Sequence, residues 1–306
     1  MRSRCTDTKQ REDPRQYEHS GSHDYAHIFN LHVRSARVNN FSCDRQVDLG
    51  WRRICHTAAV ITVSRLMHSP VKGLELVEYP SLELGPLGAP FDRRFFVVNA
   101  AGELMGSWSH GRLCLTRAEY DGVTLTMHFP DGSVVSAPDP IVGEAIDLIW
   151  DSDEPTTAHL VDGPWAAGLS EVLGEPARLA RVNDSTGGWS AHAVSLIDVA
   201  SIAALEQGSL DDRRFRMTMT LSGGAAFEED SWLGHDVAIG SAVLAVRTAC
   251  ERCVATTRDP RTGDRDVNTL RAMKAVRGAP NLGVYCDVVT PGRVSLGDEV
   301  RPLGLS

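Results

Sequence analysis

AAVITVSRLMHSPVKGLELVEYPSLEL (residues 58–84) contains the first regular apolar pattern of the chain. Its apolar residues alternate with polar ones and many are β-branched, which is typical of β-strands separated by turns. The pattern continues in FDRRFFVVN (91–99), GVTLTMHFP (122–130), GSVVSAP (132–138) and AIDLIW (145–150). Asp131-Gly132 is a typical hairpin turn. The first half is therefore predicted to be a small, mostly antiparallel β domain or barrel that ends near residue 155.

The second half mixes helical and strand patterns. Helices are expected in PWAAGLSEVLG (164–174), SLIDVASIAALEQG (195–208) and NTLRAMKAVRG (268–278), which combine apolar faces with a first-turn Pro, a capping Asn or a closing Gly. Strands are expected in RMTMTLSG (216–223), DVAIGSAVLAVRTAC (236–250), LGVYCDVV (282–289) and GRVSLGDEVRPL (292–303). The fold class predicted is α+β, mainly β.

The first 57 residues differ from the rest, because they are polar, mixed in charge and without apolar periodicity. We expect residues 1–57 to be a disordered or loosely attached extension, followed by domains at 58–155 and 156–306. A metal-binding arm is the alternative, although the spacing of its residues matches no zinc pattern. Its residues are Cys5, His19, His23, His27, Cys43 and Cys55.

The amino-acid composition and net charge of the chain argue against some classes of function. The chain has 306 residues with 42% apolar and 23% charged residues, as expected for a globular protein. A net charge of −9 argues against nucleic-acid binding through bulk charge. No apolar run reaches the roughly 18 residues that cross a bilayer, and no secretory signal is seen. Seven scattered cysteines fit a reducing cytoplasm with free thiols, so a cytoplasmic location without membrane partners is predicted.

The stretch ACERCVATTRDPRTG (249–263) holds a Cys-x-x-Cys pair. A structural zinc site would need a second ligand pair, and none follows at suitable spacing. A thioredoxin-type dithiol would need a helix start after the pair, which VATTRDPRTG does not provide. The remaining possibilities are two small buried residues at a strand end, or a thiolate that holds a soft metal whose other ligands come from a cofactor.

Two further groups of residues could carry chemistry. Lys72, Arg93 and Arg216 would form an anion cradle if the fold brings them together, although each alone is more typical of a solvated surface. FEEDSW (227–232) offers carboxylates that could act as a general acid pair, or simply a polar turn before a strand.

Together these elements resemble, in the same order, the MOSC domain and the MOSC N-terminal β-barrel domain. SPVKG resembles the family's YPVKS, and FDRRFFVVNAAGEL its DRRW-type strand with a D/N-x-x-G turn. The family's RPN…G…EDxW…xIG run is similar to RRFRMTMTLSG followed by FEEDSWLGHDVAIG. Its C-x-R-C-x-x-T-T-x-D-P-x-T-G loop is similar to ACERCVATTRDPRTG. Its closing FGxY…GxIxxGDxV is similar to LGVYCDVVTPGRVSLGDEV. The similarity runs from about residue 63 to about residue 302. Amidoxime-reducing components and bacterial proteins that detoxify N-hydroxylated bases belong to this family.

The resemblance implies an N-terminal β-barrel-like domain packed on a MOSC β-barrel domain with peripheral helices. It also implies a molybdenum cofactor (Mo-molybdopterin) held between the two domains. Cys253 would be the metal ligand, with Cys250 beside it. Lys72 and Arg93 would contact the phosphate end of the cofactor, and Arg216 matches the Arg of the RPN motif.

The chain departs from the family pattern around this site. Thr218 stands where the motif has Asn, and Gly73 where it has Ser, which leaves a backbone N–H for the cofactor. Glu251 replaces a Ser within C-x-R-C, and His192 lies in a segment that replaces the usual D-x-x-P. His192 and Glu251 are candidate catalytic proton donors, although His192 could equally be a satisfied core histidine.

The function predicted from the resemblance is a molybdenum-dependent oxidoreductase that reduces small N-hydroxylated compounds. No iron–sulfur spacing of the C-x4-C-x2-C type is present, so the electrons are expected from a separate donor protein, a ferredoxin or a reductase. The alternative is a sulfur carrier or cofactor-delivery protein that uses Cys253 as a persulfide or thiolate.

Overall fold

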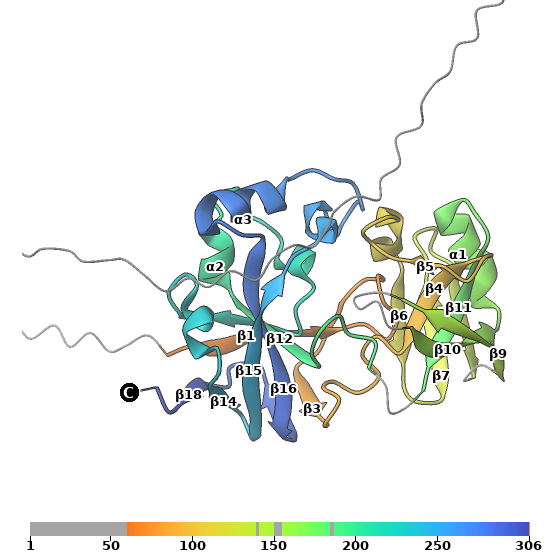
Figure 1. Ribbon diagram of the computed structural model, residues 1–306. Helices are drawn as coiled ribbons and strands as arrows, with labels where there is room; N and C mark the ends of the chain where they lie inside the picture. The colour runs from red at the N-terminus through yellow and green to blue at the C-terminus, as the bar shows by residue number, and fades with distance from the viewer. Residues whose placement is uncertain (1–59, 139–140, 150–154, 184–186, 306) are drawn as a thin grey trace, which may run out of the picture. The chain divides into compact units, whose positions relative to one another are not determined.

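A computed structural model describes residues 60–138, 141–149, 155–183 and 187–305 (Figure 1). All elements given below belong to one compact unit, Cys55–Ser306. The predicted N-terminal extension and the alternative metal-binding arm lie outside the described residues.

The larger sheet has eight strands in the order β18-β14-β15-β16-β12-β13-β1-β2. Their bounds are β1 Thr62–His68, β2 Val77–Glu78, β12 Val194–Asp198, β13 Met219–Ser222, β14 Asp236–Ile239, β15 Ala242–Glu251, β16 Asn281–Thr290 and β18 Val300–Leu303. Neighbours are antiparallel except β12 and β13. The sheet curls until the start of β1 meets β18: Val300 N donates to Ile61 O (2.8 Å), and Val63 N donates to Asp298 O (2.9 Å).

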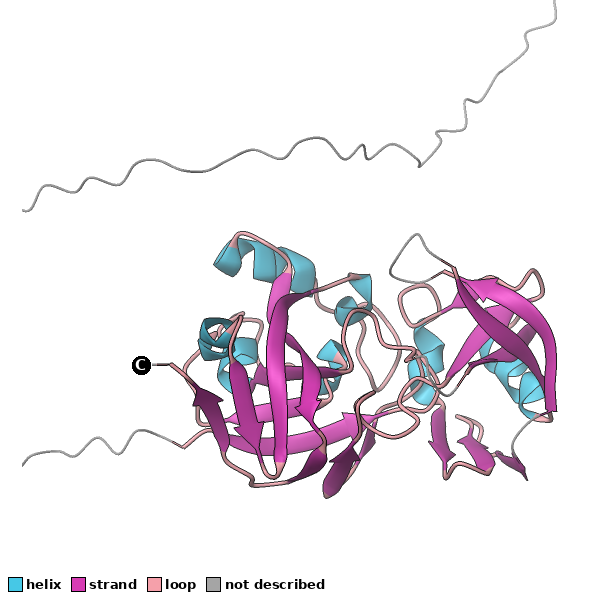
Figure 2. Ribbon diagram, turned by 60° about the horizontal axis from the view of Figure 1, so that its bottom comes forward, coloured by secondary structure: helices cyan, strands magenta, loops and turns pink. Residues whose placement is uncertain are grey.

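The other strands form smaller sheets (Figure 2). A five-stranded sheet has the order β5-β4-β11-β10-β9, with β4 Phe95–Asn99, β5 Leu104–Met105, β9 Ile141–Leu148, β10 Thr156–Asp162 and β11 Ala177–Val182. β6 Arg117–Tyr120, β7 Thr124–His128 and β8 Val134–Pro138 form a meander, and β3 Ser81–Leu84 pairs with β17 Gly292–Ser295. The α+β, mainly β prediction is confirmed. β10 and β11, which follow residue 155, belong to the same sheet as β4 and β5. The predicted division of the chain into an extension at 1–57 and domains at 58–155 and 156–306 stays a prediction.

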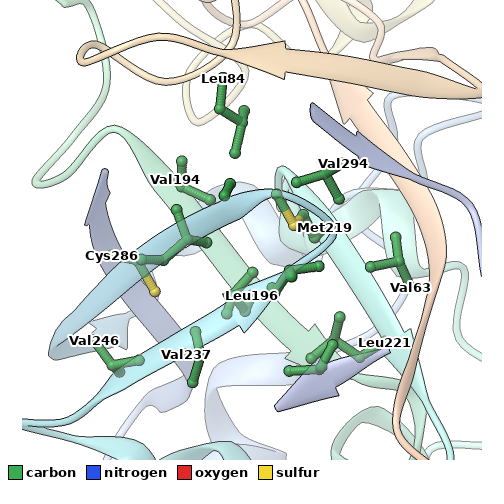
Figure 3. Packing of buried hydrophobic residues seen from close by; sticks show 14 of the residues in the cluster. Val63, Leu84, Val194, Leu196, Met219, Leu221, Val237, Val246, Cys286 and Val294 are labelled. Carbon is green, nitrogen blue, oxygen red and sulfur yellow. The ribbon is translucent and has the colours of Figure 1, made fainter. Parts of the chain in front are cut away.

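The core of the larger sheet lies on the concave side of its curl. Val63, Leu196, Met219, Leu221 and Val237 are each at most 2% exposed and belong to one apolar cluster. Figure 3 shows these side chains reaching toward one another from different strands. Full burial of such a side chain contributes about 1.5–3 kcal/mol. Strand alternation that turns one face inward therefore explains why the β-branched stretches form this sheet.

The helices test the sequence predictions directly. α1 Trp165–Leu173 ends at Gly174, and α3 Thr269–Arg277 begins at Asn268, whose Oδ1 accepts from Arg271 N (3.0 Å), so both predictions are confirmed. The predicted helix at 195–208 is wrong over its first part. Those residues form β12, and only α2 Val199–Ala203 is helical.

The reason for the error is tertiary pairing. All five residues of β12 are buried, and the strand lies between β13 and β16. Sheet pairing on both edges outweighs the helical spacing of the apolar residues. In the part of the chain that is described, no helix combines the length and apolar character needed to span a membrane.

The acidic segment FEEDSW forms a short 3-10 helix, η3 Glu228–Trp232, rather than a carboxylate pair. Glu229 is fully buried, and its Oε2 accepts from Ser201 Oγ (2.8 Å). Its Oε1 has no hydrogen-bond partner among the residues described. Burial raises the pKa of Glu229 to about 7, because the charged form loses its hydration.

Glu229→Gln is expected to change how stability depends on pH. With the pKa raised from 4.5 to about 7, the folded state keeps a proton that the unfolded state releases. The stabilisation is therefore complete below about pH 4.5 and is lost as the pH rises through about 7. The variant should gain roughly 2–3 kcal/mol relative to wild type between these pH values. Urea unfolding of both proteins across this range measures the difference, and parallel stability curves would contradict it.

Candidate functional site

A cavity of about 300 Å³ brings together nearly all of the predicted site residues. Its lining includes Lys72, Gly73, Arg93, His192, Arg216, Thr218, Glu251 and Cys253. Of the predicted residues, only Cys250 does not line it. The basic side chains that sequence spacing alone could not place together therefore share one cavity, which we call the Cys253 pocket.

The end of β15 determines which side chains face this pocket. The chain runs extended from Cys250 to Cys253, and exposure alternates along it. Cys250 is fully buried and Arg252 is 9% exposed, whereas Glu251 and Cys253 are exposed and line the pocket. Because successive side chains of an extended segment point to opposite sides, Glu251 and Cys253 face the pocket together.

Arg252 anchors this segment from the other side. Its Nε donates to Leu282 O (2.8 Å), its Nη1 to Phe215 O (2.9 Å), and its Nη2 contacts Met217 Sδ (2.6 Å). The Arg252 backbone N also donates to Pro280 O (2.8 Å). These bonds satisfy a buried guanidinium and hold the chain in place. Sequence reasoning missed this role, although its position between the two cysteines was the available signal.

The two threonines after Cys253 shape the next turn, η4 Val254–Thr257. Thr256 N and Thr256 Oγ1 both donate to Cys253 O (3.2 and 3.1 Å), and Thr257 Oγ1 donates to Val254 O (2.7 Å). Arg258 then donates from Nη2 to Trp108 O (3.2 Å). Local hydrogen bonds of the two threonines and the long-range bond from Arg258 to Trp108 therefore hold the loop that carries the Cys253 thiol at the pocket.

Cys250 has a different environment from Cys253. Burial raises the pKa of the Cys250 thiol to about 11, and the thiol forms a hydrogen bond with Tyr285, which lines the pocket. Within the described ranges no group of three or more His, Cys, Asp or Glu side chains could hold a metal. A metal at Cys253 would thus need its other ligands from a bound group.

The positively charged lining of the pocket, which we call the cationic wall, consists of Lys72, Arg93, Arg214 and Arg216, and Gly73 follows Lys72 directly. Lys72 is 7% exposed, and its Nζ donates to Gly188 O (3.0 Å) and to Ser190 Oγ (3.4 Å). Gly73 has φ +93°, a region that L side chains rarely adopt, and a Cβ there would lie 3.3 Å from Ser107 N. A glycine is therefore needed where the backbone passes close to the pocket rim.

Arg93 and Arg216 lie next to each other, both in the left-handed region with φ of 53° and 52°. Arg93 forms an ion pair with Asp92, and its Nη2 donates to Arg216 O (3.0 Å). Arg216 Nη2 donates to Leu74 O (2.7 Å). Burial and then the nearby Arg93 charge lower the pKa of Arg216 to about 10. No carboxylate of the described chain forms an ion pair with Arg216, so its charge is available to an anion.

Arg214 and Thr218 complete the wall. Arg214 is 5% exposed and pairs with Asp266 through two hydrogen bonds (2.7 and 2.5 Å), while its Nε is buried without a partner among the described residues. Thr218 Oγ1 accepts from Ser195 N (3.2 Å), so that hydroxyl is already engaged. Arg214 was not predicted, and only its place in the RRFR run pointed to it.

His192 is a pocket residue rather than a core histidine, because its side chain is 23% exposed. Its Nδ1 lies 2.8 Å from Asp287 Oδ1, and Arg247 Nε donates to the other oxygen (2.8 Å). Burial raises the pKa of Asp287, but the bonds from His192 and Arg247 outweigh it and keep that pKa below the usual range. The carboxylate fixes the imidazole orientation and leaves Nε2 for exchange of a proton.

Aromatic side chains form further walls, and sequence reasoning missed them. Trp108 and Trp189 both line the pocket. Each ring lies over a glycine two residues earlier, since an added Cβ would come within 1.9 Å of Trp108 at Gly106 and 1.5 Å of Trp189 at Gly187. A Gly-x-Trp spacing is the sequence signal for this ring placement.

Comparisons with known proteins support the resemblance. Residues 60–144 match the family model of the MOSC N-terminal beta barrel domain, and residues 181–301 that of the MOSC domain. The chain is 26% identical over 301 residues to mitochondrial amidoxime-reducing component 1 of Homo sapiens, covering 84% of this chain and 89% of the relative. It is also 26% identical over 270 residues to the molybdenum cofactor sulfurase of Danio rerio, covering 73% of this chain but 31% of that protein.

One solved structure is similar over much of the chain. The YUAD protein from Bacillus subtilis has 12% sequence identity and a TM-score of 0.39, with coverage of 79% of this chain and 95% of the other. The two matched family ranges include the pocket residues Lys72, Arg93, Arg216 and Cys253.

Arg252→Lys is expected to destabilise the protein by roughly 2–3 kcal/mol, because an ammonium cannot reach the two carbonyls and the sulfur that the planar guanidinium contacts. Urea unfolding measures this loss. Arg301→Lys is the control, since Arg301 is exposed on β18 and its replacement should change stability by less than about 0.5 kcal/mol. Equal stability losses in both variants would contradict an anchoring role for Arg252.

Proposed function

The chain belongs to the MOSC-domain proteins with a MOSC N-terminal barrel, and from this premise we propose that it is a molybdenum-cofactor-dependent oxidoreductase acting on small N-hydroxylated compounds. The observation that carries the proposal is the exposed thiol of Cys253 in one cavity with Lys72, Arg93 and Arg216. A soft thiolate and a set of cations are the two features that such a cofactor requires from its protein.

The residues of the pocket fit this group. Lys72 and Arg214 are 7% and 5% exposed, whereas Cys253 is exposed, so these two cations are less accessible than the thiol. The half-buried Arg216 forms no ion pair with a carboxylate of the described chain, and a cation in this state is stabilised by an anion such as the cofactor phosphate. Cys253 would hold the metal, while the bound group itself provides the remaining ligands.

The roles of the protein side chains follow from this arrangement. When bound, the cofactor supplies two-electron redox chemistry at the metal. In the proposed reaction the N–O bond of R–NHOH breaks, and two electrons and two protons give R–NH2 and water. The electrons come from a separate donor protein, a ferredoxin or a reductase. His192, oriented by Asp287, holds a proton at Nε2 for the departing oxygen, while Trp108 and Trp189 provide apolar walls that exclude water.

A sulfur-carrier function is the second candidate. The exposure of Cys253 and the similarity to molybdenum cofactor sulfurase favour it. In that case Cys253 would carry a persulfide sulfur and no reductase turnover would occur.

Cys253→Ala is expected to remove bound molybdenum and to lower reduction of an N-hydroxylated compound by at least about 100-fold, because the metal loses its protein ligand. Purified protein from a host that makes the cofactor is assayed for molybdenum, for fluorescent pterin and for turnover with an artificial electron donor. The control is Cys286→Ala, since Cys286 is fully buried in the apolar core and should leave the metal content unchanged. Metal-free wild-type protein that carries sulfane sulfur on Cys253 would favour the carrier.

Arg216→Met is expected to weaken retention of the cofactor by roughly tenfold or more, because it removes a charge-assisted hydrogen bond to the anionic tail. The molybdenum-to-protein ratio after extensive dialysis measures this loss. Arg213→Met is the matched control, because Arg213 pairs with Asp211 and lines a different cavity. Similar retention in both variants would contradict a role for Arg216 in binding the anion.

A further inference from the structure

The charges around the Cys253 pocket are distributed unevenly. Its described lining contains the cations Lys72, Arg93, Arg214, Arg216 and Arg252 but a single carboxylate, that of Glu251. An isolated carboxylate in a cation-rich wall is expected to pair with one of the cations unless its position serves another partner.

Glu251 does not pair with these cations. Arg93 pairs with Asp92, Arg214 pairs with Asp266, and Arg252 bonds to carbonyls on the buried side. Among the described residues, no ion pair or side-chain hydrogen bond involves Glu251, which is exposed. Its carboxylate therefore projects into the accessible part of the pocket and is available to a ligand.

The backbone places Glu251 close to Cys253. Glu251 is the last residue of β15 and pairs with Asn281 of β16. Residues two apart in an extended segment lie about 6.5–7 Å from each other and on the same side. The exposed carboxylate and the exposed thiol thus face the same side of the pocket, whereas Lys72 and Arg214 in its lining are buried.

We propose that Glu251 determines substrate specificity by binding the positive charge of amidinium or guanidinium compounds. Such planar cations carry paired N–H donors that match a carboxylate in two parallel hydrogen bonds. Trp108 and Trp189 supply aromatic faces that also attract cations. That these compounds are the reductase substrates rests on the proposed function, whereas the charge-selective binding itself does not.

The test uses two probes of similar shape, benzamidine, which is cationic, and benzamide, which is neutral. Binding to the purified protein with its native cofactor content is measured by tryptophan fluorescence and by calorimetry. Glu251→Gln is expected to weaken benzamidine binding roughly fivefold, the scale of a partly exposed charged hydrogen bond, and to leave benzamide binding unchanged. Glu144→Gln makes the same change of charge at an exposed position that does not line the pocket, and should affect neither probe.

Two results would overturn the inference: unchanged benzamidine affinity in Glu251→Gln, or an equal loss for both probes. Thermal unfolding confirms that the variant is folded. A parallel turnover measurement compares a cationic N-hydroxyguanidine with a neutral N-hydroxylated compound of similar size. Charge-selective binding that depends on Glu251 in a protein without turnover would support the inference while refuting the proposed reductase function. Turnover with the same charge preference in wild type and in Glu251→Gln would support the reductase function and overturn the role of Glu251.

Discussion

The pocket depends on the buried guanidinium of Arg252. One planar group bonds to Phe215 O, Met217 Sδ and Leu282 O, and so ties together the segments that carry the arginines, the cysteine loop and β16. Because the guanidinium is on the buried side of an extended chain, the residues on either side of it must point the other way. Burial of a charge is tolerated here because its donors are satisfied, and the positions of Glu251 and Cys253 follow from it.

A second constraint is local charge in a chain of net charge −9. Arg93 and Arg216 both adopt left-handed backbone conformations, which cost of order 1 kcal/mol or more each, and lie close enough for the Arg93 charge to lower the pKa of Arg216. Asp92 offsets only part of this repulsion through its ion pair with Arg93. Backbone strain and unbalanced positive charge thus occur together at Arg93 and Arg216, where a bound anion would offset the charge. The bulk composition of the chain does not reveal this local charge.

Local signals predicted the parts of the fold that depend on local interactions. The helices at 164–174 and 268–278 follow from their end residues, which act within one turn. The helix prediction for 195–208 is wrong over β12 because the apolar spacing there suits a helix, while the strand partners β13 and β16 lie further along the chain. Motif resemblance located the pocket residues, but the contacts of Arg214 and Arg252 with distant residues were not visible in any pattern.

The spacing of Cys250 and Cys253 also predicts on which side of the chain each thiol lies. A pair three residues apart faces one side in a helix, but opposite sides in an extended strand. Since the preceding residues already predicted a strand, the same spacing argues against a dithiol and against two ligands on one metal. The structure has this arrangement, with Cys250 buried beside Tyr285 and Cys253 exposed. The presence of one cysteine thiol rather than two at the pocket is therefore a consequence of strand geometry, and a metal bound there would need its other ligands from a bound group.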